Sequence, residues 1–167
     1  MSELKPLSRK GIGPALEKAE RYRLLNEPFE AESICSDVLD VEPDHQRALV
    51  ILILALTDQF LAGDDVRIEE PRALLDRLQS EYERAYYGAV CCERWAKALL
   101  ARGTPGAGAN AWSWLREAME GFARAEALRP PGNDDAILRW NACVRTMERH
   151  ENLRPPAESE EPGPGLE

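Results

Sequence analysis

The sequence predicts an all-α fold in which about seven helices pack as antiparallel hairpins. Apolar residues recur at the i, i+3, i+4, i+7 spacing of one helix face along most of the chain, and no segment alternates apolar and polar residues as a half-buried strand does. Proline and glycine clusters divide this pattern into segments of helical length. The chain has 167 residues, of which 44% are hydrophobic, and this is enough for one domain with its own core.

The N-terminal part of the chain predicts a helical hairpin. One apolar stripe covers residues 12–22 and a second covers 31–39. The first helix should end near Asn26, because Pro28 disfavours helical geometry in the residue before it. The second should end at Pro43. Two antiparallel helices joined by so short a connection must pack against each other.

Residues 44–61 predict a third helix that is apolar nearly all round between Leu49 and Leu56. A helix without a polar face is buried on most sides, so we expect this one at the centre of the fold. Gly63, Asp64 and Asp65 should break it, and residues 69–79 predict a short fourth helix.

A long fifth helix should begin at Ser80 and reach Arg102. Ser80 and Glu83 have the spacing of a capping box, in which the serine oxygen accepts from a backbone amide three residues later. Glu93 and Lys97 form a favourable i,i+4 pair on this helix.

We interpret residues 103–111, which contain three glycines, as a flexible insertion. Asn110 should open a sixth helix that reaches Leu128, and Asn133 or Asp134 should cap a last helix that ends near His150. These elements divide the chain into an N-terminal arm (1–11), a helical domain (12–150) and an acidic, Pro/Gly-rich tail (151–167) that we expect to be disordered.

An internal repeat links the second and sixth predicted helices at an offset of 87 residues. Small and large residues recur with the same spacing and are followed by a proline; the matched pairs are Ala31 with Ala118, Cys35 with Phe122, Val38 with Ala125, Val41 with Leu128, and Pro43 with Pro130. This pattern resembles the second helix of a tetratricopeptide (TPR) repeat. The resemblance implies a right-handed solenoid of stacked hairpins, closed by a C-terminal capping helix.

The resemblance also implies a function, namely a scaffold, adaptor or co-chaperone-like module that binds a peptide or partner helix in a concave groove. In that family the first helix of each hairpin lines the groove. By register, the partner-binding candidates are Glu17, Glu20, Arg23, Arg47, Val50, Leu54, Val90, Arg94 and Lys97. Leu16, Ile51, Asp58, Glu93, Leu138, Arg139 and Arg145 occupy further lining positions. Val50, Ile51 and Leu54 could equally belong to the core, and Arg94 and Lys97 could equally be ordinary solvated positions.

Aromatic residues suggest a second partner-facing surface. Trp112 and Trp114 are two residues apart and point about 200° from each other on a helix, so we expect one of them to be exposed or to cover the insertion. Tyr86 and Tyr87 on the fifth helix raise the same expectation.

Two alternative functions remain open at this point. The same apolar and aromatic surface could make a homodimeric structural protein, or a pocket between helices could make a small-molecule sensor. Enzyme activity, a metal site and a cofactor are not expected. Cys35, Cys91, Cys92 and Cys143 form no CxxC pair, and the two histidines have no nucleophile or carboxylate at motif spacing.

Charge and hydropathy exclude two classes of partner. A net charge of −9, from 21 Lys and Arg against 30 Asp and Glu, argues against a nucleic-acid surface. The longest apolar run, residues 48–56, is far shorter than the ~20 residues that span a bilayer. Without a recognisable secretory signal, and with cysteines that fit a reduced state, we expect a cytoplasmic location.

Overall fold

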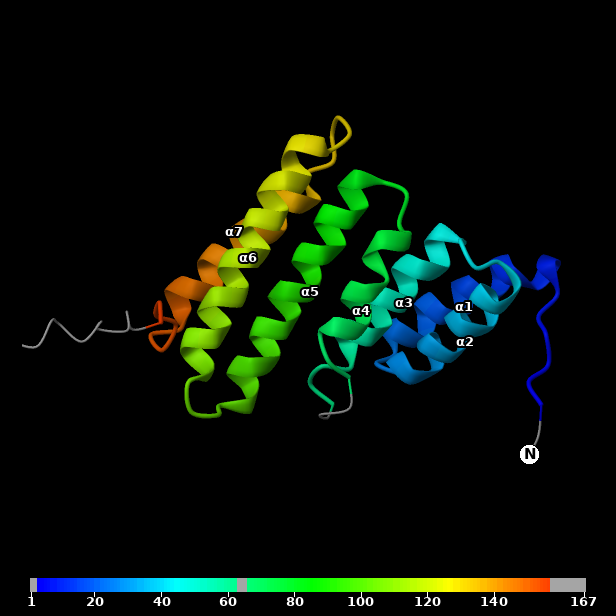
Figure 1. The fold of residues 1–167 in the computed structure, drawn as a ribbon, viewed down its shortest axis with the longest axis horizontal. Coiled ribbons are helices and arrows are strands. Elements are labelled where there is room, and N and C mark those ends of the chain that lie inside the picture. Colours follow the sequence, from blue (N-terminus) through cyan, green and yellow to red (C-terminus); the bar gives the residue numbers. More distant parts are fainter. Residues whose placement is uncertain (1–2, 63–65, 157–167) are drawn as a thin grey trace, which may run out of the picture.

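The computed structural model describes residues 3–62 and 66–156 and is all-α over this part of the chain. The α-helices are α1 (Ile12–Leu24), α2 (Pro28–Val41), α3 (Gln46–Asp58), α4 (Glu69–Ala73), α5 (Glu81–Arg102), α6 (Ala107–Leu128) and α7 (Asp135–Arg149), with 3₁₀ turns at Arg9–Gly11 and Leu75–Arg77. They follow one another across an elongated body in the order of the sequence (Figure 1). The predicted fold class, all-α with about seven helices, is confirmed.

Side-chain caps mark the starts of α3 and α5, and a hydrogen-bonded asparagine precedes α7. Ser80 Oγ accepts from the backbone amide of Glu83 at 3.2 Å, as predicted. His45 Nδ1 accepts from the amide of Ala48 at 3.3 Å and so caps α3. Asn133 Oδ1 accepts from the amide of Asp135 at 3.0 Å before α7. Asn26, directly after α1, has a positive φ of 59°, a conformation that asparagine tolerates better than most residues.

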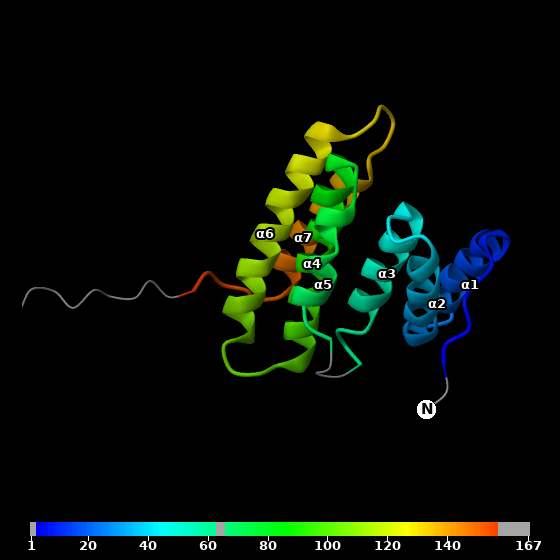
Figure 2. The same cartoon turned by 45° about the vertical axis from the view of Figure 1, so that its right-hand side comes forward.

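The apolar helix α3 lies between two buried clusters, as its sequence predicts. Its buried side chains divide between them: Leu49 and Ile53 pack with α5, α6 and α7, whereas Ile51 and Leu56 pack with α1 and α2. Figure 2 shows α1 and α2 on one side of α3, and α5, α6 and α7 on the other. The helix therefore joins the N-terminal hairpin to the C-terminal group.

The longest helices, α5 and α6, approach each other closely at Gly121. A Cβ atom built on Gly121 would lie 2.8 Å from the Cβ of Ala89 on α5, closer than two such atoms can come. A glycine is therefore required where the two helices cross. Figure 1 shows the pair lying side by side over most of their length.

Two predicted segments differ from the structure. The fourth helix was expected over residues 69–79, but α4 ends at Ala73 and a separate 3₁₀ turn follows. The insertion predicted over residues 103–111 is mostly helical, because α6 begins at Ala107 rather than Asn110. Gly103 and Gly106, with φ of 63° and 79°, make the whole reversal within four residues.

The ordered chain continues past the end of α7, so the expectation of a disordered tail from residue 151 is wrong at its start. Leu153 is buried in the same cluster as α5, α6 and α7. The carbonyl oxygen of Asn152 fills the space that a Cβ on Gly108 would need, since the two atoms would be 2.2 Å apart. Residues 157–167, and the break expected at 63–65, lie outside the described residues.

The aromatic residues are packed within the molecule to a greater extent than expected. Trp112 and Trp114 are both half-buried against the core. The guanidinium of Arg116 lies 5.9 Å from the ring centre of Trp112, and that of Arg72 lies 5.6 Å from the ring of Trp114. On α5, Tyr86 contacts the rings of Tyr82, Tyr87 and Phe122. Neither tryptophan is fully exposed, because an arginine covers each ring.

Candidate functional site

Ion pairs join α1, α3, α5 and α7 in succession, and most of them use the predicted groove residues. We call this surface the odd-helix face. Its charged members are Glu20, Arg23, Arg47, Asp58, Glu93, Arg94, Lys97 and Arg139. The structure thus brings together, on four helices, side chains that lie up to 119 positions apart in the sequence.

Two pairs link α1 to α3. Arg47 Nη2 lies 2.7 Å from Glu20 Oε2, in an exposed position near the start of α3. Arg23 Nε lies 2.7 Å from Asp58 Oδ2 at the other end of α3, where both side chains are mostly shielded from solvent. Because the two pairs lie at opposite ends of α3, they fix the alignment of α1 along it.

Asp58 also links α3 to α5. Its second carboxylate oxygen accepts from Arg94 Nη1, and the same nitrogen lies 2.7 Å from Thr57 Oγ1. Burial lowers the pKa of Arg94, although the charge of Asp58 opposes this shift. Arg94 therefore stabilises the packing of α5 against α3, and little of its charge is available to a partner.

A buried carboxylate links α5 to α7. The side chain of Glu93 is 1% exposed, and its two oxygens accept from Lys97 Nζ and, at 3.0 Å, from Arg139 Nη1. Burial disfavours the charged form of Arg139, but Glu93 and Tyr86 outweigh it, so that the pKa of Arg139 is raised. The side chain of Lys97 is 44% exposed. The carboxylate of Glu93 thus lies below the surface, and its two partners, Lys97 and Arg139, lie on its solvent side.

Two hollows open on the odd-helix face, and Lys97 lines both. One, of about 250 Å³, lies between α1, α3 and α5; its lining residues are Arg23, Asn26, Thr57, Asp58, Phe60, Leu61, Arg94 and Lys97. The other, of about 320 Å³, lies between α5 and α7; its lining residues are Tyr86, Glu93, Lys97, Asp135, Leu138, Arg139 and Ala142. The two hollows meet at Lys97 on α5, and we refer to them together as the groove.

Several predicted contact residues do not reach this groove. Val90 is fully buried, so it belongs to the core and cannot touch a partner in this conformation. Val50 and Leu54 are half-buried and pack against the core cluster. Glu17 is exposed beside the Glu20–Arg47 pair, away from both hollows.

Of the two exposed leucines that line the hollows, only one was a lining position predicted from the sequence. Leu61 is 66% exposed and Leu138 is 64% exposed, one in each hollow. Leu138 was a lining position by register, but nothing marked Leu61, which follows the end of α3. Leu61 lies three positions past Asp58, the last residue of α3, and a large apolar residue at that place is the only sequence signal for it.

Core packing accounts for the four cysteines, and helix capping accounts for His45. Burial raises the pKa of all four cysteine thiols to about 12; these are Cys35, Cys91, Cys92 and Cys143. His45 serves as a helix cap. Within residues 3–62 and 66–156, no three His, Cys, Asp or Glu side chains gather as metal ligands would. None of the helices in these two ranges has both the length and the apolarity needed to cross a bilayer.

Comparisons with known proteins leave the function to be inferred from the geometry. No protein-family model matches the chain, and neither a curated protein nor a solved structure matches it.

Proposed function

We propose that this chain is a TPR-like protein-interaction module that holds a segment of a partner protein along the odd-helix face. The observation that carries the proposal is the pair of hollows that meet at Lys97, on the face predicted to bind. One exposed leucine lines each hollow, Leu61 in one and Leu138 in the other, and the exposed Lys97 lines both. This arrangement suits a partner segment with two apolar anchors.

The burial of the repeated stripe supports the TPR-like part of the proposal. Three of the five matched pairs are fully buried on both helices, namely Ala31, Cys35 and Val38 on α2 with Ala118, Phe122 and Ala125 on α6; in a fourth pair Val41 is half-buried and Leu128 is 46% exposed. Identical spacing with identical burial is what two copies of one packing unit require. The helices α2 and α6 would then form the outer layer, and the odd-numbered helices the binding layer.

The charges favour an acidic partner. The two hollows are lined by four cations, Arg23, Arg94, Lys97 and Arg139, and by three carboxylates, Asp58, Glu93 and Asp135, of which Glu93 is buried. The remaining positive charge, which is most exposed on Lys97, points to acidic residues in the partner. A carboxylate between two apolar anchors would meet Lys97 at the crossing of α5.

A selection from random peptides tests this proposal, since it requires no known partner. Random twelve-residue peptides would be selected on the immobilised protein, and their affinities measured by fluorescence anisotropy for wild type, Leu61→Ala, Leu138→Ala and Lys97→Gln. We expect selected peptides to be acidic and to lose about tenfold in affinity with each change, the scale of an interface hot spot. Lys97→Gln should also reduce the salt dependence of binding.

The matched control is Leu128→Ala, which truncates an exposed leucine on α6, outside both hollows. It should leave affinity unchanged. Peptides that bind equally to all the groove variants, or that are weakened only by Leu128→Ala, would place the interaction elsewhere. Basic selected peptides would overturn the charge argument.

Self-association is a second candidate, favoured by a separate apolar surface. Leu24, Leu25 and Phe29, at the α1–α2 turn, are all mostly exposed, and Phe29 lines a hollow of about 340 Å³ with Pro28 and Val66. Light scattering over a range of concentrations should show dimers if this surface joins two copies. In that case Phe29→Ser should return the protein to the monomer mass.

A further inference from the structure

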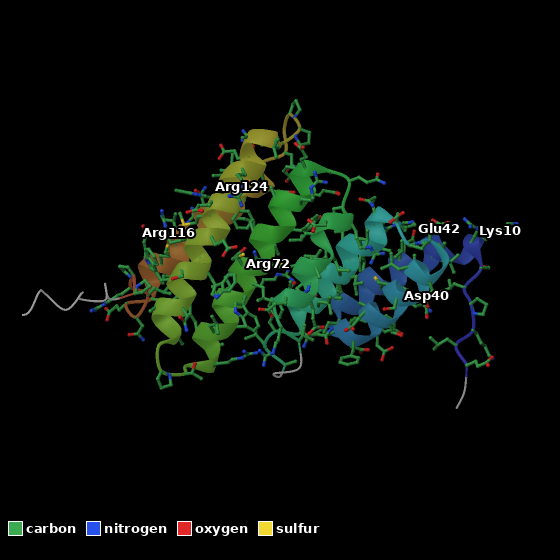
Figure 3. The ribbon with its side chains drawn as sticks, in the orientation of Figure 1. Lys10, Asp40, Glu42, Arg72, Arg116 and Arg124 are labelled. Carbon is green, nitrogen blue, oxygen red and sulfur yellow. The ribbon has the colours of Figure 1, made fainter. Side chains whose placement is uncertain are left out.

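Three arginines surround a small hollow on the side of the molecule formed by α4, α5 and α6. Arg72 comes from α4, Arg84 from α5 and Arg124 from α6, and all three line one hollow of about 160 Å³. Figure 3 shows Arg72 over α5 and Arg124 along α6, on the same side of the molecule. This hollow shares no lining residue with the groove of the odd-helix face.

The floor of the hollow consists of residues with little or no side chain. Gly88 and Ala89 on α5 and Gly121 on α6 line it, together with Ala85 and the buried Cys92. The close approach of the two helices at Gly121 leaves a shallow space that the three arginines also line. A volume of about 160 Å³ exceeds the roughly 30 Å³ that a water molecule occupies in the liquid, so a small anion fits there.

Two of the arginines are held in place by other groups. Arg84 Nη1 donates to the carbonyl oxygens of Leu78 and Gln79, at 2.5 and 3.1 Å. Arg72 Nη2 donates to Glu117 Oε1 at 3.2 Å, and its guanidinium lies over the ring of Trp114. Both guanidinium groups are therefore positioned before any ligand arrives, which lowers the entropy cost of binding.

The third arginine has unused donors. Within residues 3–62 and 66–156, Arg124 makes no hydrogen bond and no ion pair, although it lines the hollow. The charged residues that line the hollow are three arginines and one acid, Glu117, a formal charge of +2 on a chain whose net charge is −9. A local excess of cations without a protein counter-charge is open to an anion.

We propose that this hollow, the Arg72–Arg84–Arg124 site, binds a phosphoryl group. Guanidinium groups present paired N–H donors that match the oxygens of a phosphate, and a phosphoryl dianion balances a charge of +2. The phosphoryl group can come from free inorganic phosphate or from a phosphorylated side chain of a partner. The site goes beyond the proposed interaction module and stands on other residues, so either proposal can fail without the other.

Nuclear magnetic resonance of the arginine side chains tests the site. Inorganic phosphate would be titrated at constant ionic strength into ¹⁵N-labelled protein, and the Nε–Hε signals followed. We expect saturable shifts of the Arg72, Arg84 and Arg124 signals. Arg124→Gln should weaken phosphate binding about tenfold, equivalent to about 1.4 kcal/mol. Glu117→Gln should tighten it about threefold, because it removes the competing carboxylate from Arg72.

Arg116→Gln is the matched control, since Arg116 is an exposed arginine of the same helix on the side turned away from α5 (Figure 3). It should change phosphate affinity less than twofold. An equal loss in Arg116→Gln and Arg124→Gln, or shifts that sodium chloride reproduces at the same ionic strength, would overturn the site. The absence of any saturable shift up to about 20 mM phosphate would also overturn the site, because a specific site should bind phosphate with a dissociation constant in the millimolar range or below.

A phosphoserine derivative with both termini blocked distinguishes free phosphate from a phosphorylated side chain as the ligand. N-acetyl-O-phosphoserine methylamide would be titrated beside its unphosphorylated analogue. Binding tighter than that of inorganic phosphate, lost without the phosphoryl group, assigns the site to a phosphorylated side chain. Equal or weaker binding assigns it to the free anion. Binding of the unphosphorylated analogue with the same affinity would contradict the proposal.

Discussion

Glu93 on α5 holds Arg139 of α7 at 3.0 Å while its own side chain is only 1% exposed. A buried carboxylate incurs a large desolvation cost, and here Lys97 and Arg139 compensate it from the solvent side. The pair joins the last helix to the centre of the molecule. It also places both cations at the hollow between α5 and α7, so the same contact serves packing and the proposed groove.

In the cluster of Glu93, Lys97 and Arg139, removing the acid should lower the free energy of unfolding less than removing both cations. Removing the acid with Glu93→Gln leaves two cations that can still reach water, so we expect a loss of about 2 kcal/mol in the free energy of unfolding, below the usual 3–5 kcal/mol for a broken buried pair. Removing both cations, with Lys97→Gln and Arg139→Gln together, leaves a buried charge unpaired and should cost about 3–5 kcal/mol. Urea denaturation of both variants checks the order.

A larger loss in Glu93→Gln than in the double variant would contradict this account of the cluster. Glu120→Gln is the control for the acid, because Glu120 is exposed on α6 and makes no ion pair within the described residues. Its free energy of unfolding should stay within about 0.5 kcal/mol of wild type.

Asp58, at the end of α3, should contribute more to stability than the aspartates of the N-terminal hairpin. Asp58→Asn keeps the shape of the side chain but removes the charge that Arg23 and Arg94 share. Because both arginines are largely shielded, we expect a loss of about 2–3 kcal/mol. Asp40→Asn, on an exposed residue of α2, should change little. Equal effects of the two substitutions in thermal or urea unfolding would show that the link between α1, α3 and α5 is not stabilising.

Stability should fall in alkaline solution because of the buried thiols. Burial raises their pKa from 9.0 to about 12 in the folded chain; the residues are Cys35, Cys91, Cys92 and Cys143. Between these values the unfolded chain loses thiol protons that the folded chain keeps. The stabilisation is therefore fully present below pH 9 and is lost as the pH rises toward 12, by about 1 kcal/mol per thiol at pH 10.

Cys143→Ala measures how much one thiol contributes to the loss of stability in alkaline solution. Under reducing conditions, the difference in unfolding free energy between pH 7.5 and pH 10 should shrink by about 1 kcal/mol in this variant. Thr146→Ala, a change on the same helix at a residue that does not titrate, should lower stability equally at both pH values. If Cys143→Ala keeps the full alkaline loss, other groups cause it.

The order of the helices could be predicted from sequence because proline, glycine and capping residues act locally. Ser80 and Pro28 each mark a helix end through contacts within a few residues: α5 begins directly after Ser80, as predicted, and α1 ends at Leu24, two residues before the predicted Asn26. The start of α6 could not be predicted, because glycines at 103, 106 and 108 are typical of a loop. Only the packing of Asn152 against Gly108, 44 positions away, shows why that glycine lies in a helix.

The face of the candidate site was predictable, but the roles of its residues were not. Register with the TPR pattern placed Arg23 on the first helix, and Arg94 and Lys97 on the fifth, on one predicted face, and all three line the same hollow. Whether a side chain on α5 is free or buried depends on its neighbours from α3, α6 and α7, which the sequence does not show. Val90 was therefore expected on the surface and lies in the core, whereas Arg94 was expected to bind a partner and braces α3 instead.

The crossing of α5 and α6 gives the sharpest stability prediction. Gly121→Ala would bring a Cβ to 2.8 Å from that of Ala89, so we expect a loss of about 1–3 kcal/mol from overpacking. Ala89→Gly in the same chain should restore part of it, since the clash is between these two atoms. Gly13→Ala, on α1, meets nothing within 4 Å and should stabilise by about 0.5–1 kcal/mol through a helix-propensity gain. Urea denaturation of all three variants separates a steric loss from a general effect of alanine: a gain at Gly121 would mean that the two helices are farther apart than the structure has them.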